Sequence, residues 1–154
     1  MVRYLLLSLL GVALLGLALF GGWMLLQPGD SPALRTKADQ AAIQGTWEAQ
    51  SSEEGGKDVP AGAIKGLRLT FEGENFFETK GDVRIDEGTF RLDAGRIPRE
   101  IDLTTKERTL PGIYGIENDS LIVVVGREGK VRPTAFGRGS GTDEVSTNFR
   151  RAKK

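Results

Sequence analysis

The chain has 154 residues, a length that suits a single domain with a short additional segment. It carries 21 basic and 21 acidic side chains, and this balance argues against a nucleic-acid-binding protein, which would carry a basic excess. The absence of cysteine and histidine excludes thiol nucleophiles, disulfides, zinc fingers, haem ligation and histidine acid–base chemistry. Any metal would have to be a hard ion held by oxygen ligands, and the sequence implies no cofactor.

Residues 4–26 contain no charged side chain and consist largely of leucine, alanine, glycine and phenylalanine. As a helix, such a run reaches about 34 Å, slightly more than the hydrocarbon thickness of a bilayer. Trp23 lies near its far end, where an indole ring favours the membrane–water interface. The sequence therefore predicts an N-terminal transmembrane helix within residues 1–27 that anchors the chain in a membrane.

A cleaved secretory signal is the alternative for this segment. Such signals have a shorter apolar region, of roughly 7–15 residues, followed by a small-x-small cleavage site. The only tolerable site, Ser31-Pro32-Ala33, lies well beyond the apolar run and fits poorly. Arg3 and the terminal amine precede the run and favour an inside N-terminus. We therefore favour an uncleaved anchor, with the C-terminal domain outside the cytoplasm, over secretion after cleavage.

Residues 28–41 are predicted to be a linker, because Pro28, Gly29 and Pro32 interrupt helical structure. One short turn is expected between Asp39 and Gln44. Beyond it, apolar and polar residues alternate with the period of two that is typical of β-strands. Residues 42–154 therefore form the predicted folded domain.

Eight strands are expected in this domain, separated mainly by tight turns and with no helical segment between them. They fall at residues 46–50, 67–72, 75–80, 88–93, 100–104, 112–117, 121–125 and 145–150. Eight short antiparallel strands in sequential order usually close into a barrel, which removes the exposed sheet edges. The predicted fold is therefore all-β: an eight-stranded antiparallel up-and-down barrel, preceded by the transmembrane helix.

Bulky residues dominate the positions that are expected to point into the barrel. They are Leu67, Leu69, Phe71, Phe77, Phe90, Leu92, Ile101, Leu103, Leu121, Val123, Val125 and Phe149. Such a set goes far toward filling an eight-stranded barrel, whose interior holds side chains or one small ligand. A shallow site at the barrel mouth is therefore the most that we expect, whereas an empty volume above roughly 300 Å³ would favour ligand binding.

Several short motifs occur together in a fixed order. They are Gln44-Gly45-Thr46-Trp47, Ile64-Lys65-Gly66-Leu67, Glu100-Ile101-Asp102-Leu103, Gly112-Ile113-Tyr114 and Arg132-Pro133-Thr134-x-Phe136. Together they resemble an uncharacterised lipocalin-like domain family that is common in planctomycete bacteria and often occurs in exported proteins. The Gly45-Thr46-Trp47 triplet is similar to the G-x-W signature of lipocalins. The resemblance implies a small β-barrel, and it brings no established activity, ligand or catalytic residue.

The lipocalin resemblance also implies that an arginine of the last strand packs across the G-x-W tryptophan. Trp47 is expected to point inward near the closed end of the barrel. Arg151 resembles the arginine partner by position, because alternation along the last strand aims it toward that end. A bulge near Asn148 would instead give this role to Arg150.

The Arg132-Pro133-Thr134 segment lies in the long glycine-rich connection at residues 126–142. Pro133 restricts Arg132 to extended backbone. We interpret the segment as a cover across one end of the barrel, with Phe136 as its buried anchor. The alternative is a recognition loop for a partner.

Glu100 and Asp102 are the carboxylate pair that we consider as candidate catalytic residues. Residues two apart in a strand share a face, here opposite Ile101 and Leu103. Paired carboxylates can divide acid and base roles when their surroundings push their pKa values apart, but a solvated outer face does not do so. We therefore interpret both as surface charges whose joint substitution by Asn would leave the fold almost unchanged. No catalytic or metal-binding residue is expected, and we do not expect an enzyme.

Two functional classes fit these patterns. One is a membrane-tethered structural or interaction module of the cell envelope, which displays its surface to other envelope components. The other is a binding module that holds a small apolar or amphipathic molecule at the barrel mouth. The expected partners are the membrane, through residues 4–26, and either an envelope protein or a small apolar ligand.

Overall fold

The fold was determined as a computed structural model, which describes residues 31–126, 131–137 and 143–153. The candidate anchor at residues 4–26 lies outside the described residues. In the described ranges, no helix has the length and apolar character that crossing a membrane requires. The compact unit considered below comprises Ser31–Lys154.

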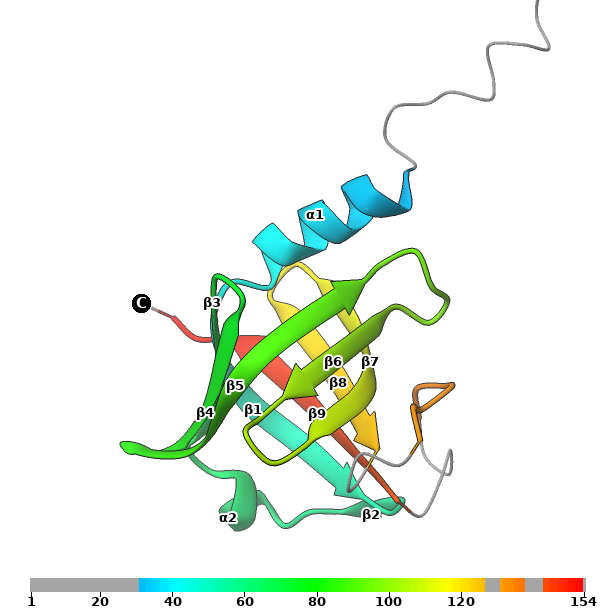
Figure 1. The fold of residues 1–154 in the computed structure, drawn as a ribbon. Helices are drawn as coiled ribbons and strands as arrows, with labels where there is room; N and C mark the ends of the chain where they lie inside the picture. Colours follow the sequence, from blue (N-terminus) through cyan, green and yellow to red (C-terminus); the bar gives the residue numbers. More distant parts are fainter. Residues whose placement is uncertain (1–30, 127–130, 138–142, 154) are drawn as a thin grey trace, which may run out of the picture. The chain divides into compact units, whose positions relative to one another are not determined.

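Within the described ranges, nine antiparallel strands form one sheet that closes on itself (Figure 1). They are β1 (Gly45–Glu54), β2 (Lys57–Asp58), β3 (Leu67–Glu72), β4 (Asn75–Lys80), β5 (Val83–Asp93), β6 (Glu100–Thr104), β7 (Thr109–Glu117), β8 (Ser120–Gly126) and β9 (Glu144–Arg151). Strands β3 to β9 pair in sequential order, and both β3 and β9 pair with β1. The short β2 pairs only with the end of β1. The eight predicted strands are therefore all present, and the predicted closed antiparallel barrel is confirmed.

Two helices depart from the sequence-based expectation. Helix α1 (Pro32–Ala42) precedes the barrel, and the single-turn α2 (Ala61–Ile64) lies between β2 and β3. Helix α1 corrects the prediction of a linker over residues 32–41. Pro32 lies at the first turn of the helix, where its missing N–H costs no hydrogen bond. The proline that we interpreted as a helix breaker is therefore the residue that starts the helix.

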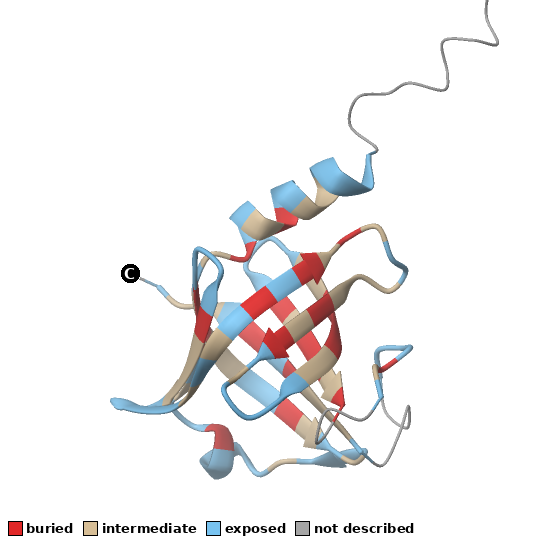
Figure 2. Ribbon diagram, viewed as in Figure 1, coloured by how far each residue is buried: buried red, intermediate tan, exposed pale blue. Residues whose placement is uncertain are grey.

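Side chains fill the interior of the barrel. The core consists of Ile43, Trp47, Leu69, Phe71, Phe76, Phe90, Leu92, Ile101, Leu103, Tyr114, Leu121, Val123 and Phe149. Buried and more exposed residues alternate along the strands, as Figure 2 shows. The rings of Phe71 and Phe90 meet edge to face, with their centres 4.7 Å apart. This packing gathers the large core side chains in the interior of the barrel.

The facing of β4 corrects one predicted core residue. Phe76, rather than Phe77, points into the core. The register pairs Phe76 with the inward Phe71, so the neighbouring Phe77 must lie on the outer face. There the guanidinium carbon of Arg84 lies 4.3 Å from the centre of the Phe77 ring. Two adjacent phenylalanines leave the facing open in the sequence, because either one can supply the inward side chain.

The first and last strands meet at Trp47 and Arg151, which are directly opposite each other. The Trp47 side chain is fully buried, and the guanidinium carbon of Arg151 lies 4.1 Å from its ring centre. Arg151 also donates hydrogen bonds to the carbonyls of Gln44 at 2.8 Å and Ala42 at 2.7 Å. We name this contact between Trp47 and Arg151 the closing latch.

Two details of β1 keep the latch in place. The register shift between β1 and β9 lies between Ala49 and Ser51 of β1, past the latch, so Arg151 keeps its position opposite Trp47. Gly45 has a φ of 103°, in the region that favours glycine. A Cβ there would lie 3.4 Å from the Arg151 guanidinium. The glycine of the Gly45-Thr46-Trp47 triplet thus gives the chain its turn into β1 beside the latch.

Substitutions of Trp47 and Arg151 should lower the free energy of unfolding by different amounts. Trp47→Ala should lower the free energy of unfolding by about 3–5 kcal/mol, because it truncates a buried aromatic side chain. Arg151→Ala should lower it by about 2 kcal/mol, through loss of the contact with the ring and of the two hydrogen bonds. Urea unfolding measures both. The exposed neighbour Arg150 is the matched control, and Arg150→Ala should have an effect within about 0.5 kcal/mol. Equal, negligible effects of the two arginine substitutions would contradict the latch.

Candidate functional site

Helix α1 covers one end of the barrel (Figure 1). Ile43, which follows the helix, lies in the core. On one side of the helix, the hydroxyl of Thr36 accepts a hydrogen bond from the backbone N–H of Ala94, in the β5–β6 loop, at 3.0 Å. On the other side, the amide of Gln40 donates to the carbonyl of Gly73, in the β3–β4 turn, at 2.8 Å. Helix α1 is therefore held by both of these connections and caps this end of the barrel.

A buried carboxylate connects the cap to the barrel. The hydroxyl of Tyr114 donates a hydrogen bond to Oδ2 of Asp39 at 2.5 Å. Arg99 donates from Nη1 to Oδ1 and Oδ2 of Asp39 at 3.2 Å and 3.0 Å. Both Asp39 and Tyr114 are buried. We name these three residues the cap cluster.

The surroundings of Tyr114 decide what the cap cluster can do chemically. Burial raises the pKa of Tyr114 well above its usual value, and the hydrogen bond to the Asp39 carboxylate raises it further. Tyr114 is therefore held as a proton donor to Asp39. Tyr114 and Arg99 both donate hydrogen bonds to this carboxylate, so the negative charge of the buried Asp39 is compensated. The arrangement suits a structural connection between α1, β7 and the β5–β6 loop.

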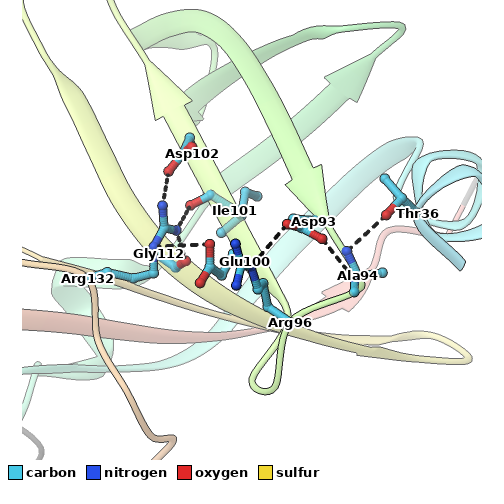
Figure 3. Close-up of polar contacts among 10 residues, drawn as sticks. Thr36, Asp93, Ala94, Arg96, Glu100, Ile101, Asp102, Gly112 and Arg132 are labelled. Atoms are coloured by element: carbon cyan, nitrogen blue, oxygen red, sulfur yellow. Dashed lines mark hydrogen bonds and ion pairs between the residues drawn. The ribbon is translucent and has the colours of Figure 1, made fainter. Parts of the chain in front are cut away.

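A second polar centre lies on the outside of the barrel, where the segment of residues 131–137 crosses β6 and β7. We name this segment the strap. Its Arg132 donates from Nη2 to Oδ1 of Asp102 at 2.6 Å (Figure 3). Nη1 of Arg132 donates to the carbonyls of Gly112 at 2.6 Å and Ile101 at 3.2 Å. Nε lies 3.5 Å from a carboxylate oxygen of Glu100. One guanidinium thus binds the strap to two adjacent strands.

Arg132 binds the backbone of both strands at one residue pair of the β6–β7 ladder. The carbonyls that it binds belong to Ile101 and Gly112, which the register places opposite each other. The arginine therefore connects β6 and β7 at the same level.

The strap also covers apolar side chains on the outer face. Ile113 and Val124 are both only 1% exposed, although they belong to the outward face of β7 and β8 and not to the core. Pro133 of the strap is buried. The ring of Phe136 reaches within 3.8 Å of the point where a Cβ on Gly115 would lie. Ile113, Val124 and Pro133 are therefore apolar side chains that are buried outside the barrel core.

These contacts correct the prediction for the strap. It lies along the outer face of β6 and β7, not across an end of the barrel. Phe136 is not the buried anchor, because it is 42% exposed. Pro133 supplies the buried side chain and Arg132 the polar attachment.

Glu100 and Asp102 lie on the outer face of β6, as predicted. The prediction that they are solvated surface charges is wrong. Ile101 and Leu103 lie in the core, so the two carboxylates do share the outer face. Their side chains are 32% and 36% exposed, and both contact Arg132. They are therefore the acceptors of the strap arginine, not freely solvated charges.

A groove of about 760 Å³ opens on the surface. Its lining includes Gly115 and Ile122 of the outer face, Phe136 of the strap, and Ile97 and Arg99 of the β5–β6 loop. Its volume exceeds the value that we associate with ligand binding. Most of its lining belongs to the outer face and the loops, and the groove also reaches the core residues Tyr114, Leu121 and Phe149.

Glu78 and Asp86 form a further carboxylate pair, on the inward face of β4 and β5. Burial raises the pKa of Glu78, and the nearby Asp86, its partner across β4 and β5, raises it further. Among the described residues, no three carboxylates gather in a way that would hold a metal ion.

The fold and these contacts define a class: a small closed β-barrel with a filled interior and a helical cap. Comparison with protein-family models, with curated proteins and with solved structures finds no match to the chain. The lipocalin-like resemblance of the motifs therefore stays a hypothesis. Two of those motifs have a structural role in this fold. Gly45-Thr46-Trp47 begins β1 and supplies the tryptophan of the closing latch, and Arg132-Pro133-Thr134 attaches the strap.

A double-mutant cycle should test the strap attachment. Asp102→Asn and Arg132→Gln should each lower the free energy of unfolding by about 1–3 kcal/mol, because each leaves a half-buried partner unpaired. The double variant should lose less than the sum, with a coupling of about 1 kcal/mol. Arg108→Gln, at an exposed arginine of the β6–β7 connection, is the matched control and should have little effect. Strictly additive losses would contradict the attachment.

An alkaline titration should test the cap cluster. In a fragment of residues 31–154, Tyr114 is the only tyrosine, because the other one is Tyr4. Its raised pKa means that its contribution to stability is complete below the unfolded pKa of about 10 and is lost above it. Phenolate absorbance at 295 nm should therefore appear only together with alkaline unfolding. Asp39→Asn should shift that step to lower pH, and Tyr114→Phe should abolish it. Ordinary titration near pH 10 in the folded fragment would contradict the cluster.

Proposed function

We propose that the protein is a membrane-tethered, non-enzymatic interaction module of the cell envelope. Residues 4–26 would hold it in the membrane, and the barrel would present its outer surface to other envelope components. One observation carries the proposal: the interior of the barrel is filled with large side chains, among them Trp47, Phe71 and Ile101. A barrel packed in this way resembles a protein core and not a carrier cavity.

The ends of the barrel support this reading. At one end, α1 and Ile43 cover the interior, and the cap cluster holds the helix in place. Toward the other end, the hydroxyls of Ser52 and Thr147 are buried and bonded to each other at 2.9 Å. These two buried hydroxyls are therefore each other's hydrogen-bond partners.

The polar clusters outside the core also favour a structural reading over catalysis. Asp39 is engaged by Tyr114 and Arg99, and Asp102 is engaged by Arg132. A general base must be within reach of a substrate proton. These carboxylates instead attach the cap and the strap to the barrel, which leaves the surface that they shape as the feature open to partners.

A second candidate function rests on the surface groove. Its lining combines apolar side chains, Ile97 and Phe136, with the guanidinium groups of Arg96 and Arg99. This chemistry suits a small anionic amphipathic molecule bound outside the barrel. The groove is open, so the interaction module remains the function that the geometry supports better.

Cell fractionation tests the tether. The full-length chain should sediment with membranes and resist extraction by high salt, and the fragment of residues 31–154 should be fully soluble. The fragment begins at residue 31 so that it keeps the whole of α1. A shorter fragment that began at Asp39 would lose most of this helix. A mature N-terminus near Leu34, found by mass spectrometry, would contradict an anchor and indicate a secreted domain.

The same fragment tests the filled interior. Titration with a fluorescent fatty acid should show no saturable binding. Saturable binding that Phe136→Ala abolishes would favour the second candidate, because Phe136 lines the groove and lies outside the core. Saturable binding that Phe136→Ala leaves unchanged would contradict a filled barrel.

A further inference from the structure

The outward face of α1 carries a single charged side chain, that of Lys37. Leu34, Lys37, Ala38 and Ala41 are exposed and follow one another at intervals of three or four residues, so they share one face. The outer side of the helix is exposed in Figure 2. Helices on soluble domains usually present charged and polar residues to water. Among the exposed positions of α1, only Lys37 is charged.

The β5–β6 loop extends this face. Ile97 is 96% exposed and Leu34 of α1 is 49% exposed. The loop lies against the start of the helix, because Cβ of Pro32 is 2.8 Å from the point where a Cβ on Gly95 would lie. The hydrogen bond between Thr36 and Ala94, drawn in Figure 3, fixes the same contact. Two exposed branched apolar side chains therefore belong to the same end of the molecule.

Basic side chains predominate on α1 and on residues 94–99, and the carboxylates of Glu74 and Asp93 lie beside them. Residues 31–42 and 94–99 contain a single carboxylate, that of Asp39, and it is buried in the cap cluster. Lys37 and Arg96 are exposed there. Arg96 contacts Asp93 at 3.4 Å, but both side chains are largely in water, where such a pair is weak. The surface thus combines apolar side chains with accessible cations.

The course of the chain brings this surface close to the proposed anchor. Helix α1 begins at Pro32, and the apolar run ends at residue 26. The residues between them can span at most about 20 Å when fully extended. If residues 4–26 cross a bilayer, the end of the barrel that α1 covers must therefore stay near the lipid headgroups. This step rests on the proposed function.

We propose that this surface lies on the membrane. It consists of Leu34, Lys37, Ala38 and Ala41 of α1 and Arg96 and Ile97 of the β5–β6 loop, and we name it the lipid-facing surface. Ile97 and Leu34 enter the interfacial region of the bilayer, and Lys37 and Arg96 lie among anionic headgroups. Interfacial helices bind lipid through the same combination of apolar side chains and nearby cations. The barrel is then held against the membrane in one orientation and does not swing on a linker.

Site-specific fluorescence can test this orientation in the full-length chain. The natural sequence has no cysteine, so Ile97→Cys and Leu34→Cys each create a unique labelling site. Val83→Cys is the matched control, since Val83 is also apolar, is 64% exposed, and lies at the β4–β5 turn, away from the cap. Each variant is labelled with an environment-sensitive nitrobenzoxadiazole dye. It is then reconstituted in vesicles of phosphatidylcholine and phosphatidylglycerol, and the vesicles are recovered by flotation.

The labels at positions 97 and 34 should show blue-shifted emission and several-fold stronger quenching by headgroup nitroxide lipids than the label at position 83. Quenching at position 97 should fall on vesicles of phosphatidylcholine alone, and equal quenching there would overturn the role of Lys37 and Arg96. Emission and quenching at position 97 that equal those at position 83, on chain that floats with the vesicles, would overturn the lipid-facing surface and leave the tether intact. A chain that does not float would overturn the tether itself and the inference with it.

Discussion

The pairing of β1 with β9 is the constraint on which the rest of the fold depends. An up-and-down sheet that does not close leaves two strand edges and one apolar face in water. Here the closing latch joins those edges, with the Arg151 guanidinium lying over the buried ring of Trp47. Because large side chains fill the closed barrel, we propose that its functional surfaces lie on the capping helix, on the strap and in the groove between strands and loops. The proposal of an interaction module follows from this closure.

Arginine is the common device by which additional segments are attached to the barrel. Arg99 holds α1 through Asp39, Arg132 holds the strap through Asp102, and Arg151 holds the approach to β1 through two backbone carbonyls. A planar guanidinium offers five donors in fixed directions, so a single side chain can bind a carboxylate or several carbonyls of different strands at once. This explains how a chain without disulfides or histidine can attach a helix, the strap and the approach to β1 to a regular sheet with few contacts.

Local alternation was sufficient to predict the eight strands, because the facing of each residue repeats within the strand itself. It did not decide between Phe76 and Phe77, since the facing there depends on the register against Phe71. The start of α1 was missed because Pro32 both breaks a helix from within and favours its first turn. The cap cluster and the target of Arg132 could not be predicted, because Asp39 lies 60 residues from Arg99, and Arg132 lies 30 residues from Asp102. The one signal for the cap cluster in the sequence is that Asp39 is the single acidic residue of α1.

The even number of strands in the closed barrel has a mechanical consequence. Strands β1 and β9 are antiparallel neighbours, so the start of the first and the end of the last lie at the same end of the molecule, where the N–H of Ala152 binds the carbonyl of Thr46 at 2.9 Å (Figure 1). A force that pulls these two ends apart therefore loads the β1–β9 hydrogen bonds one after another, as in a zipper, and not all together in shear. The first contacts to carry that load are the hydrogen bond between Ala152 and Thr46 and, next to it, the closing latch. Unfolding of the barrel under tension would then begin at this seam.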